Sequence, residues 1–241
     1  MLADLIRAAQ PCVALTGAGI STESGIPDFR SPTGVWAQFD ATEYATISAF
    51  RRDPVKVWSF YAPRFSMLRS AEPNDAHRAL VELERRGYVR AVVTQNIDLL
   101  HERAGTRELV EVHGSIRHCE CIDCGAMYPL DEVRRMLDGA AVPRCASCGS
   151  VLKPSVVMFG ELMPEAAIDR AFELAREAAL LLVVGSTLEV TPVGSLPWET
   201  KQAGGAVAIV NLGPTAFDRQ ATLKIEGRAG EVLSAVVEQL V

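Results

Sequence analysis

The chain has 241 residues, of which 49% are hydrophobic and 22% are charged, and its formal net charge is −6. This composition is that of a folded globular protein and excludes a disordered chain. The acidic balance argues against direct nucleic-acid binding, which usually needs a basic face. The longest wholly apolar run, residues 178–184, is too short to cross a bilayer, and the N-terminus lacks a signal-peptide pattern. We therefore expect a cytoplasmic monomer that contacts neither a membrane nor nucleic acid.

Apolar runs and turn residues predict the secondary structure along the chain. The expected elements are a strand over 13–16, a long loop over 24–46, helices over 54–68 and 74–86, strands over 89–94 and 108–112, a helix over 130–137, strands over 180–184 and 206–210, and a helix over 230–240. Pro63 should kink or end its helix, and Gly87 should follow a helix end. The last two strands are apolar throughout, which is typical of strands buried on both faces of a parallel sheet. The sequence thus predicts an α/β fold with right-handed crossovers.

A glycine-rich turn follows the first predicted strand, with Gly17 and Gly19 on either side of Ala18. Two glycines at this place let the backbone approach a pyrophosphate, whose charge the N–H groups of the turn and of a following helix can bind. The match to the dinucleotide-binding pattern G-x-G-x-x-G is incomplete, because Thr22 stands where the third glycine would be. A tight strand-to-helix turn without a ligand is the alternative interpretation.

Two C-x-x-C pairs lie in a cysteine-rich stretch, residues 119–150, that interrupts the alternation of strands and helices and that we interpret as an inserted module. Four thiolates fill the coordination sphere of a zinc ion, so the site should be structural and should staple a segment too small for its own core. His118 and Cys119 lie close by as alternative ligands. The two-residue spacing favours Cys121, Cys124, Cys145 and Cys148. Cys12 is expected as a small buried hydrophobic residue.

Polar residues follow the second predicted strand, where Asn96 and Asp98 can grip a carboxamide or a ribose. Ligands of open α/β sheets bind beyond the carboxyl ends of the strands. A helix cap is the alternative role for Asn96. His113 ends the next predicted strand, and with an ordinary pKa of about 6.5 it can act as a general base near neutral pH. His77 and His101 are expected to be structural histidines in helices.

These motifs and several others follow one another as in the sirtuin family, which the chain resembles over almost its whole length. The segments that carry the resemblance are 17–21, 25–30, 94–98, 112–114, the two cysteine pairs, 154–161, 185–190 and 210–211. The resemblance implies a Rossmann-like parallel sheet with helices on both faces, plus a small inserted zinc-ribbon module. It also implies an enzyme that uses NAD⁺ as co-substrate to remove acyl groups from protein lysines, giving nicotinamide, O-acyl-ADP-ribose and free lysine.

The same resemblance implies one catalytic domain, residues 1–241, with three parts. The NAD-binding part would comprise 1–27, 70–113 and 160–241. A cofactor loop and helical module would lie at 28–69, and the zinc-binding module and substrate strand at 114–159.

Matching the family motifs position by position implies the site residues. His113 is the base, and Asn96 and Asp98 hold the ribose and the nicotinamide amide. Contacts to NAD⁺ are implied for Gly17, Ala18, Gly19, Ser21, Asp28, Phe29, Arg30, Trp36, Gln95, Asn96, Ile97, Asp98, Gly185, Ser186, Thr187, Asn211, Leu212, Gly213 and Ala229. Contacts to the acyl-lysine substrate are implied for Ala45, Tyr61, Arg64, Val157, Met158, Phe159 and Gly160. The substrate should add a strand at 156–159 through main-chain hydrogen bonds, which carry little sequence information.

Tyr61 and Arg64 fit the Tyr-x-x-Arg pattern of sirtuins that remove acidic acyl groups such as succinyl, malonyl and glutaryl, and Ala45 matches the small residue of their pocket. Arginine can bind a carboxylate through two N–H groups while the tyrosine hydroxyl donates a third bond. The chain departs from that subgroup at Asp28, where threonine is usual, and at the Gly-Ser-Thr of 185–187. We expect succinyl and malonyl removal beside deacetylation. Plain deacetylation, with Arg64 an ordinary surface residue, is the alternative.

Three other functions stay open on the sequence alone. Mono-ADP-ribosyl transfer would use the same NAD⁺ site. A non-catalytic NAD⁺-sensing module is disfavoured because His113, Asn96 and Asp98 are all present. A zinc-ribbon nucleic-acid protein is disfavoured by the net charge of −6 and by the lack of a basic, aromatic-rich module.

Overall fold

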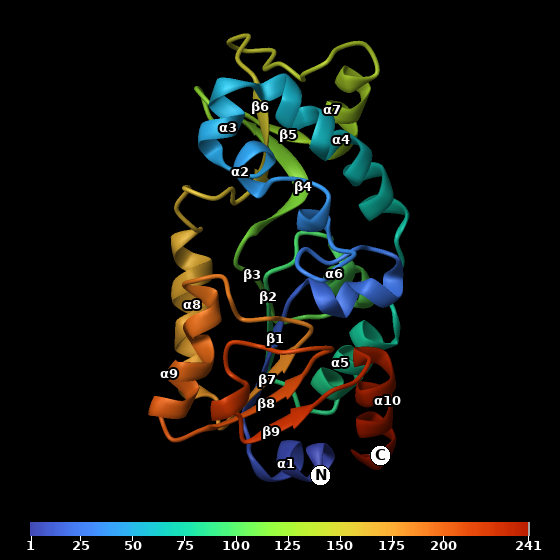
Figure 1. Ribbon diagram of the computed structural model, residues 1–241, viewed down its shortest axis with the longest axis vertical. Coiled ribbons are helices and arrows are strands. Elements are labelled where there is room, and N and C mark those ends of the chain that lie inside the picture. Colours follow the sequence, from blue (N-terminus) through green and yellow to red (C-terminus); the bar gives the residue numbers. More distant parts are fainter. Residues whose placement is uncertain (241) are drawn as a thin grey trace.

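Two β-sheets organise the computed structural model, which describes residues 1–240 (Figure 1). The larger is a six-stranded parallel sheet with the order β3-β2-β1-β7-β8-β9. Its strands are β1 (Cys12–Thr16), β2 (Ala91–Thr94), β3 (Leu109–Glu111), β7 (Leu180–Val184), β8 (Ala206–Val210) and β9 (Leu223–Ile225). The parallel sheet predicted from the apolar runs is confirmed, and β7 and β8 have the predicted bounds.

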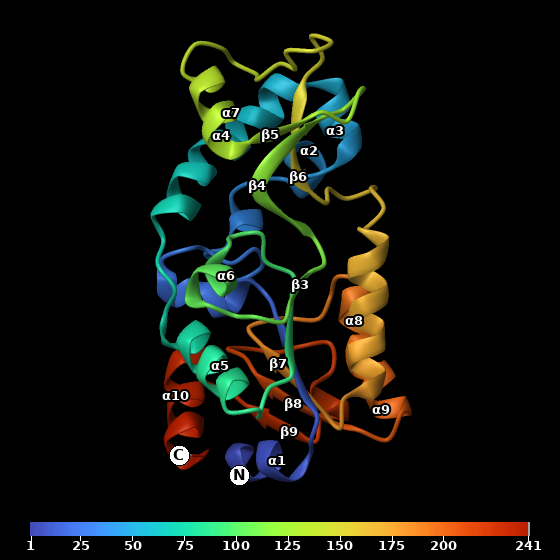
Figure 2. The same cartoon turned by 180° about the vertical axis from the view of Figure 1, so that it is seen from behind.

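Helices cover both faces of this sheet, as Figures 1 and 2 show from opposite sides. One face carries α1 (Leu2–Ala8), α5 (Asp75–Arg85) and α10 (Ala229–Leu240), and the other carries α8 (Glu165–Glu177) and α9 (Leu196–Gln202). Alternate residues of a strand point to opposite faces. Cys12 and Ala14 of β1 therefore join the core under the first group, and Val13 and Leu15 join the core under the second. Cys12 is fully buried, as predicted.

The order of the strands creates a branch point beside β1. From β1 the chain goes on to β2 at one side, whereas β7 lies at the other side of β1. Loops at such a point diverge, and open α/β sheets bind ligands there, at the carboxyl ends of the strands. The segments that begin at Gly17, Gln95, Gly185 and Asn211 all start at these strand ends. The expected NAD segments thus share one edge of the sheet.

The second sheet has three antiparallel strands, β5 (Met127–Pro129), β4 (Gly114–Cys121) and β6 (Leu152–Val156). With α7 (Leu130–Leu137) it forms the inserted module at the top of Figure 1, beside α2 (Ala41–Tyr44), α3 (Ile47–Arg52) and α4 (Pro54–Ser70). One apolar core joins the module to these helices and includes the buried Trp58, Phe65 and Val133. The indole Nε1 of Trp58 also donates to the carbonyl of Leu152, at 2.8 Å. Helices and zinc module are therefore packed as one unit.

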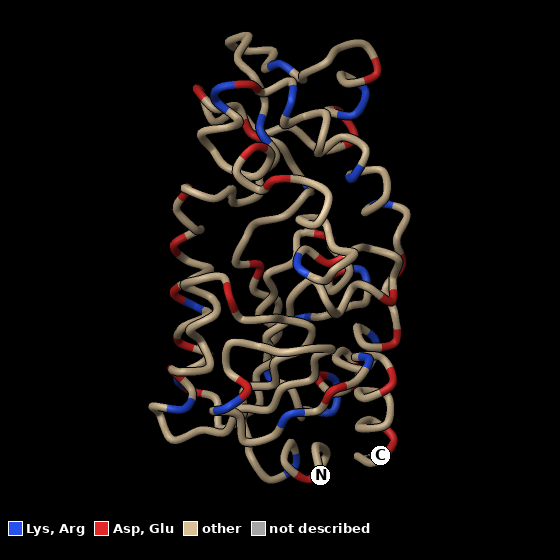
Figure 3. Tube along the Cα trace, in the orientation of Figure 1, with Lys and Arg blue, Asp and Glu red and all other residues tan. Residues whose placement is uncertain are grey.

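Several short helices complete the described chain. They are α6 (Leu100–Ala104) and the 3-10 helices η1 (Ala18–Ser24), η2 (Val35–Ala37), η3 (Val193–Ser195) and η4 (Asp218–Gln220). No helix within residues 1–240 has the length and apolarity that a membrane crossing requires. Figure 3 shows basic and acidic residues interspersed along the trace in both halves of the molecule. The residue ranges given above for the NAD-binding part, the helical module and the zinc-binding module stay a prediction.

The helix expected over 54–68 is confirmed as α4, and two details of the predictions are corrected. α4 does not end at Pro63 but runs on to Ser70, because buried aromatic residues before and after the proline, Phe60 and Phe65 among them, fix the helix against the core. This packing outweighs the local cost of an interior proline, which is about 3 kcal/mol. The segment 24–46 is not one long loop, because η2 and α2 lie within it. The carboxylate of Asp40 caps α2 by accepting the backbone N–H of Thr42, at 2.8 Å.

Candidate active site and zinc centre

The glycine turn after β1 packs directly on the turn after β7. The backbone N–H of Gly19 donates to the carbonyl of Gly185 at 2.8 Å. Gly185 has a φ of +64°, and a Cβ built on it would lie 2.2 Å from the backbone N of Ile20. A Cβ on Gly17 would meet the Gly185 carbonyl oxygen at 2.8 Å. Only glycines fit here, so the two turns expected to bind the pyrophosphate meet backbone to backbone.

Residues 18–24 continue the turn as the 3-10 helix η1. The helix start predicted to follow the glycine turn comes earlier, at Ala18 between the two glycines, and the helix is of the 3-10 type. Asn74, the N-cap of α5, is hydrogen-bonded to η1. Its side-chain amide donates to the Ile20 carbonyl at 2.7 Å and to the Ser24 hydroxyl at 3.0 Å. Ser21, on η1, is 1% exposed and points into the polar cluster.

Asn96, Ser21 and Asp98 form one buried hydrogen-bonded cluster. The Asn96 amide donates to the Gly17 carbonyl and to the Ser21 hydroxyl, both at 3.1 Å. The Ser21 hydroxyl donates to Asp98 Oδ2 at 2.7 Å, and Asp98 Oδ1 accepts the backbone N–H of Leu100 at 2.9 Å. Burial raises the pKa of the Asp98 carboxyl above its ordinary value. Asn96 is therefore no helix cap; its amide instead links β2 to the glycine turn.

His113 lies just beyond β3 and is tied to the loop after β2. Its Nδ1 is 2.9 Å from the backbone carbonyl of Gln95. Because a carbonyl oxygen only accepts, the neutral ring carries its proton on Nδ1 and has the lone pair on Nε2. Burial lowers the pKa of His113, although the bond to Gln95 opposes this shift. A neutral imidazole that can accept a proton on Nε2 is thus present at neutral pH.

The loop after η1 brings an aromatic stack and a cation to the site. Phe29 stacks on Trp36 with ring centroids 5.3 Å apart, and Trp36 stacks on Phe60 at 6.0 Å. Phe29 remains 38% exposed, which suits a residue that covers a ligand. Arg30 Nε lies 2.9 Å from the carboxylate of Glu189, in the segment after β7. The Asp28 carboxylate stays local and accepts the backbone N–H of Ser31 at 2.9 Å.

The segments after β7 and β8 supply further polar groups at the same edge. The Ser186 hydroxyl accepts the side-chain amide of Gln95 at 2.9 Å and the backbone N–H of Leu188 at 3.2 Å. Asn211 folds over its own turn and donates to the carbonyls of Leu212 and Gly213. These contacts bring together most of the expected NAD residues. Thr187 lies in the segment after β7, Ile97 lies in the segment after β2, and the buried Ala229 begins α10.

The segment 157–160, expected to bind substrate, lies beyond the end of β6 at Val156 and forms no continuous strand. Val157 donates its backbone N–H to the His113 carbonyl at 2.9 Å. Phe159 donates to the Ala45 carbonyl at 2.9 Å and accepts from Ile47 at 3.1 Å. These backbone contacts fix residues 157–160 beside His113 and Ala45, and the strand that a substrate peptide should add at 156–159 stays a prediction. Ala45, expected in the acyl pocket, directly borders this segment.

Tyr61 and Arg64 lie one turn apart on α4, next to the aromatic cluster. Tyr61 is buried, and burial raises the pKa of its hydroxyl above the ordinary value. The Arg64 guanidinium lies 3.6 Å from the ring centre of Phe60 and 4.5 Å from that of Phe39, and its Nη1 donates to the Phe60 carbonyl at 2.7 Å. Arg64 is thus a half-buried, stacked residue and not an ordinary surface arginine.

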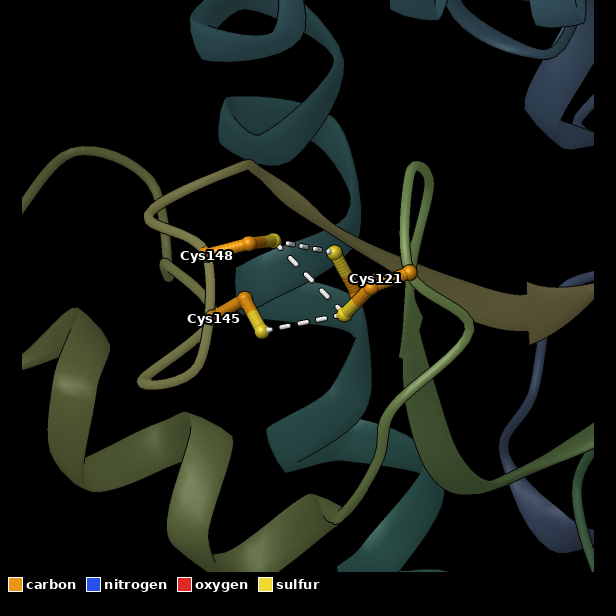
Figure 4. A group of neighbouring side chains, drawn as sticks. Cys121, Cys145 and Cys148 are labelled. Atoms are coloured by element: carbon orange, nitrogen blue, oxygen red, sulfur yellow. Dashed lines mark hydrogen bonds between the residues drawn. The ribbon is translucent and has the colours of Figure 1, made fainter.

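Four sulfur atoms of the inserted module converge, as predicted. The Sγ atoms of Cys121, Cys124, Cys145 and Cys148 all lie within 4.8 Å of one another. Figure 4 shows three of these side chains pointing toward a common centre. Three of the Sγ–Sγ separations are 3.4–3.6 Å, close to the roughly 3.8 Å between sulfurs of a tetrahedral zinc site with bonds of about 2.3 Å. The four thiolates therefore fit one structural zinc ion. Cys119 is outside this group, and burial raises its pKa to about 12.

Three contacts of the site were missed at the sequence level. They are the pairing of Glu189 with Arg30, the contact of the Tyr128 hydroxyl with Cys145 Sγ at 3.2 Å, and the burial of Lys153 beside Glu161. The Tyr128 hydroxyl lowers the pKa of the Cys145 thiol to about 6. No local sequence pattern marks these pairs, although Lys153 and Glu161 are only 8 positions apart.

Comparison with known proteins identifies the family. The Sir2 family model matches residues 17–192. The chain is 45% identical to the NAD-dependent protein deacylase 2 of Pyrobaculum aerophilum, over 99% of this chain and 94% of that protein. It is 44% identical to the NAD-dependent protein deacetylase of Sulfurisphaera tokodaii, over 98% and 94%. A solved structure of Sir2 with a p53 peptide and NAD⁺ superposes with a TM-score of 0.91 at 41% identity, covering 99% of this chain and 96% of that one. The chain belongs to the Sir2 family, the sirtuins.

Proposed function

We propose that the protein catalyses NAD⁺-dependent removal of acyl groups from protein lysines. The observation that supports this most is the placement of His113. Its neutral imidazole directs Nδ1 at Gln95 and keeps Nε2 as an acceptor, at the sheet edge where the glycine turns and the Asn96–Ser21–Asp98 cluster meet. The deacylase and deacetylase names of the archaeal relatives point to the same reaction.

The residues of this edge fit NAD⁺. Gly17, Gly19 and Gly185 keep the two turns in backbone contact at this edge, and η1 begins there, so that a pyrophosphate could bind at its N-terminal end. Arg30 adds a guanidinium beside these turns, which can form paired hydrogen bonds to phosphate. When bound, NAD⁺ supplies an electrophilic ribose carbon and nicotinamide as the leaving group.

The chain's own residues then orient the reacting groups and exclude water. Asn96 and Asp98 are held rigidly by Ser21 and Leu100, so they can bind ribose hydroxyls and the carboxamide without reorganising. Phe29, stacked on Trp36, covers the site and keeps water away from the electrophilic carbon. His113 Nε2 takes the proton of a ribose hydroxyl as general base.

The acyl-lysine peptide would lie along residues 157–160. This segment is held by backbone bonds to His113 and Ala45, which places it between the base and the helical module. A peptide that adds to it through main-chain hydrogen bonds would be accepted with little regard to its sequence.

We further propose that succinyl and malonyl groups are removed beside acetyl. Arg64 has five N–H donors, and its bond to the Phe60 carbonyl uses only one of them. Stacking on Phe39 and Phe60 desolvates the guanidinium, which strengthens its attraction for a carboxylate. Tyr61, one turn before it, supplies a hydroxyl for a further bond.

The proposal is tested by following nicotinamide and peptide mass when the protein meets an acetyl-lysine peptide with and without NAD⁺. We expect stoichiometric loss of acetyl only with NAD⁺, and a fall of about 10²–10⁴-fold in kcat for His113→Ala. Release of nicotinamide without deacylation, with transfer of ADP-ribose to protein, would instead identify a mono-ADP-ribosyltransferase.

A further inference from the structure

Lys153, on β6, has a buried ammonium group whose donors are all used. The residue is 4% exposed. Its Nζ donates to the carbonyls of Pro154 and Val156, both at 2.9 Å, and to Glu161 Oε2 at 3.1 Å. The carboxylate of Glu120 lies 3.5 Å away. An ammonium group has three protons, so these three bonds satisfy it completely. A buried cation without such partners would be strongly unfavourable.

Glu161 lies at the far end of the segment 156–161, whose first carbonyl is bound by Lys153. Its Oε2, which accepts from Lys153, also accepts the backbone N–H of Met158 at 2.8 Å. The backbone N–H of Glu161 donates to the Met158 carbonyl at 3.0 Å. The Lys153–Glu161 pair therefore fixes both ends of residues 156–161 and one peptide group in the middle.

The segment held in this way touches the base and the acyl side of the site. Lys153 binds the carbonyl of Val156. The next residue, Val157, donates its backbone N–H to the His113 carbonyl at 2.9 Å. Glu161 binds the backbone N–H of Met158. The next residue, Phe159, forms backbone hydrogen bonds with Ala45 and Ile47. The Lys153–Glu161 ion pair thus lies a single residue away from each of these contacts.

We propose that Lys153 and Glu161 are positioning residues that set the substrate segment 157–160 against His113. This inference rests on the proposed function, in which that segment carries the acyl-lysine peptide. Without the ammonium group, the Val156 carbonyl loses its donor, and the half-buried Glu161 carboxylate loses its cation and keeps only the Met158 N–H. The peptide groups then turn to find other partners, and a shift of about 1 Å at a reacting centre can cost roughly 10²-fold in rate.

The alternative is a role in stability alone, as a clamp between β6 and the segment that follows it. The two roles differ in their kinetic effects. A clamp would lower the melting temperature and leave the kinetic constants of the folded enzyme unchanged. A positioning role raises KM for the peptide and lowers kcat, while KM for NAD⁺ stays the same, because the glycine turns and η1 make no contact with Lys153.

The test compares Lys153→Met, Glu161→Gln and Lys153→Arg with the wild type, at a temperature where melting curves show each protein folded. We expect Lys153→Met to lower kcat/KM for the acyl-peptide by about 10–100-fold with KM for NAD⁺ within about twofold. Lys153→Arg should restore most of the loss, because a guanidinium can reach the same three acceptors. Lys201→Met is the matched control, since the Lys201 ammonium group bonds to the exposed Gln220 carbonyl and lies over the Phe217 ring, and it contacts neither Lys153 nor residues 157–160.

The outcomes separate the two claims. A wild-type protein without NAD⁺-dependent deacylation overturns the proposed function whatever the variants do. An active wild type with unchanged peptide kinetics in Lys153→Met overturns the positioning role alone. If Lys153→Met does not fold, Glu161→Gln decides: it keeps an acceptor for Met158 but removes the charge, so peptide kcat/KM should still fall by several-fold, and an unchanged value contradicts the proposal.

Discussion

Arg30 Nε and Glu189 Oε2 lie 2.9 Å apart, and this ion pair joins the loop after η1 to the segment after β7. The two side chains are 33% and 57% exposed, respectively. An exposed pair of this kind contributes only about 0–1 kcal/mol. A bound pyrophosphate, which carries more charge and more acceptors than one carboxylate, should therefore displace Glu189 from Arg30.

Glu189→Gln should tighten the binding of NAD⁺ modestly. The substitution removes the negative charge that competes for Arg30, and a gain of up to about 1 kcal/mol corresponds to a two- to fivefold fall in KM for NAD⁺. Peptide KM should not change. Glu173→Gln, which breaks an exposed pair with Arg170 on α8, serves as the control. A rise in KM for NAD⁺ would show that Glu189 contacts the cofactor itself.

Tyr128→Phe should weaken zinc retention. The Tyr128 hydroxyl accepts the backbone N–H of Ala146 at 2.8 Å, so its single proton is directed at Cys145 Sγ, 3.2 Å away. Loss of such an outer hydrogen bond typically costs 10–100-fold in metal affinity. The rate of zinc transfer to a colorimetric chelator should rise accordingly. Tyr88→Phe, which removes a hydroxyl near Leu240, should leave the rate unchanged. Equal rates in both variants would contradict the role of Tyr128.

The rate of deacylation should fall at low pH, when His113 becomes protonated. A general base works only when neutral, and burial holds the pKa of His113 below its ordinary value of about 6.5. We expect kcat/KM to stay flat from pH 8 to about 6.5 and to fall only at lower pH. His118→Ala, at an exposed position on β4, should keep this profile. A fall that begins well above pH 7 would show that the limiting group is not a buried, neutral His113.

Acid should also destabilise the fold through the buried histidines. Burial lowers the pKa of His77 to about 4, and it lowers the pKa of His101 as well, whose ring centre lies 4.8 Å away. Below about pH 6.5 the unfolded chain binds protons that the folded chain does not, so the free energy of unfolding falls as the pH falls. For His77 alone the loss reaches roughly 3 kcal/mol by pH 4. His77→Gln, measured by urea unfolding, should reduce this dependence, and an unchanged slope would exclude His77 as its source.

Arg64→Met should change the choice of acyl group. Methionine keeps the aliphatic bulk but cannot bind a carboxylate, so kcat/KM for succinyl-lysine should fall by at least tenfold while that for acetyl-lysine changes by less than about threefold. Arg69→Met, near the end of the same helix, is the matched control. Unchanged succinyl turnover in Arg64→Met would leave a plain deacetylase.

The sequence predicted best those elements that a local residue pattern is enough to define. β7 and β8 are apolar at every position, and Asn74 and Gly87 frame α5 with a cap and a left-handed glycine, so their bounds could be read directly. The cysteine spacing gave the metal site for the same reason. β9 was missed because its three residues lie at the edge of the sheet and carry no periodic signal.

What the sequence left open depends on contacts between distant segments. Whether Asn96 caps a helix or binds the glycine turn is decided by Gly17 and Ser21, 79 and 75 positions away. The passage of α4 through Pro63 depends on the aromatic core that it shares with the zinc module. Lys153 is a local case. It could not be predicted as buried, because a lysine is normally exposed unless specific partners satisfy it, and two of its partners are backbone carbonyls, which no side-chain pattern marks.

The most direct measurement of the central claim uses two peptides that differ only in acetyl- or succinyl-lysine. Each is incubated with the purified protein, with and without NAD⁺, while nicotinamide release and peptide mass are followed. The account predicts that both acyl groups are lost only with NAD⁺, with one nicotinamide released per lysine freed. Loss of acetyl alone would remove the acidic-acyl proposal and keep the deacylase. Deacylation that needs no NAD⁺, or no deacylation at all by folded, zinc-loaded protein, would contradict the account.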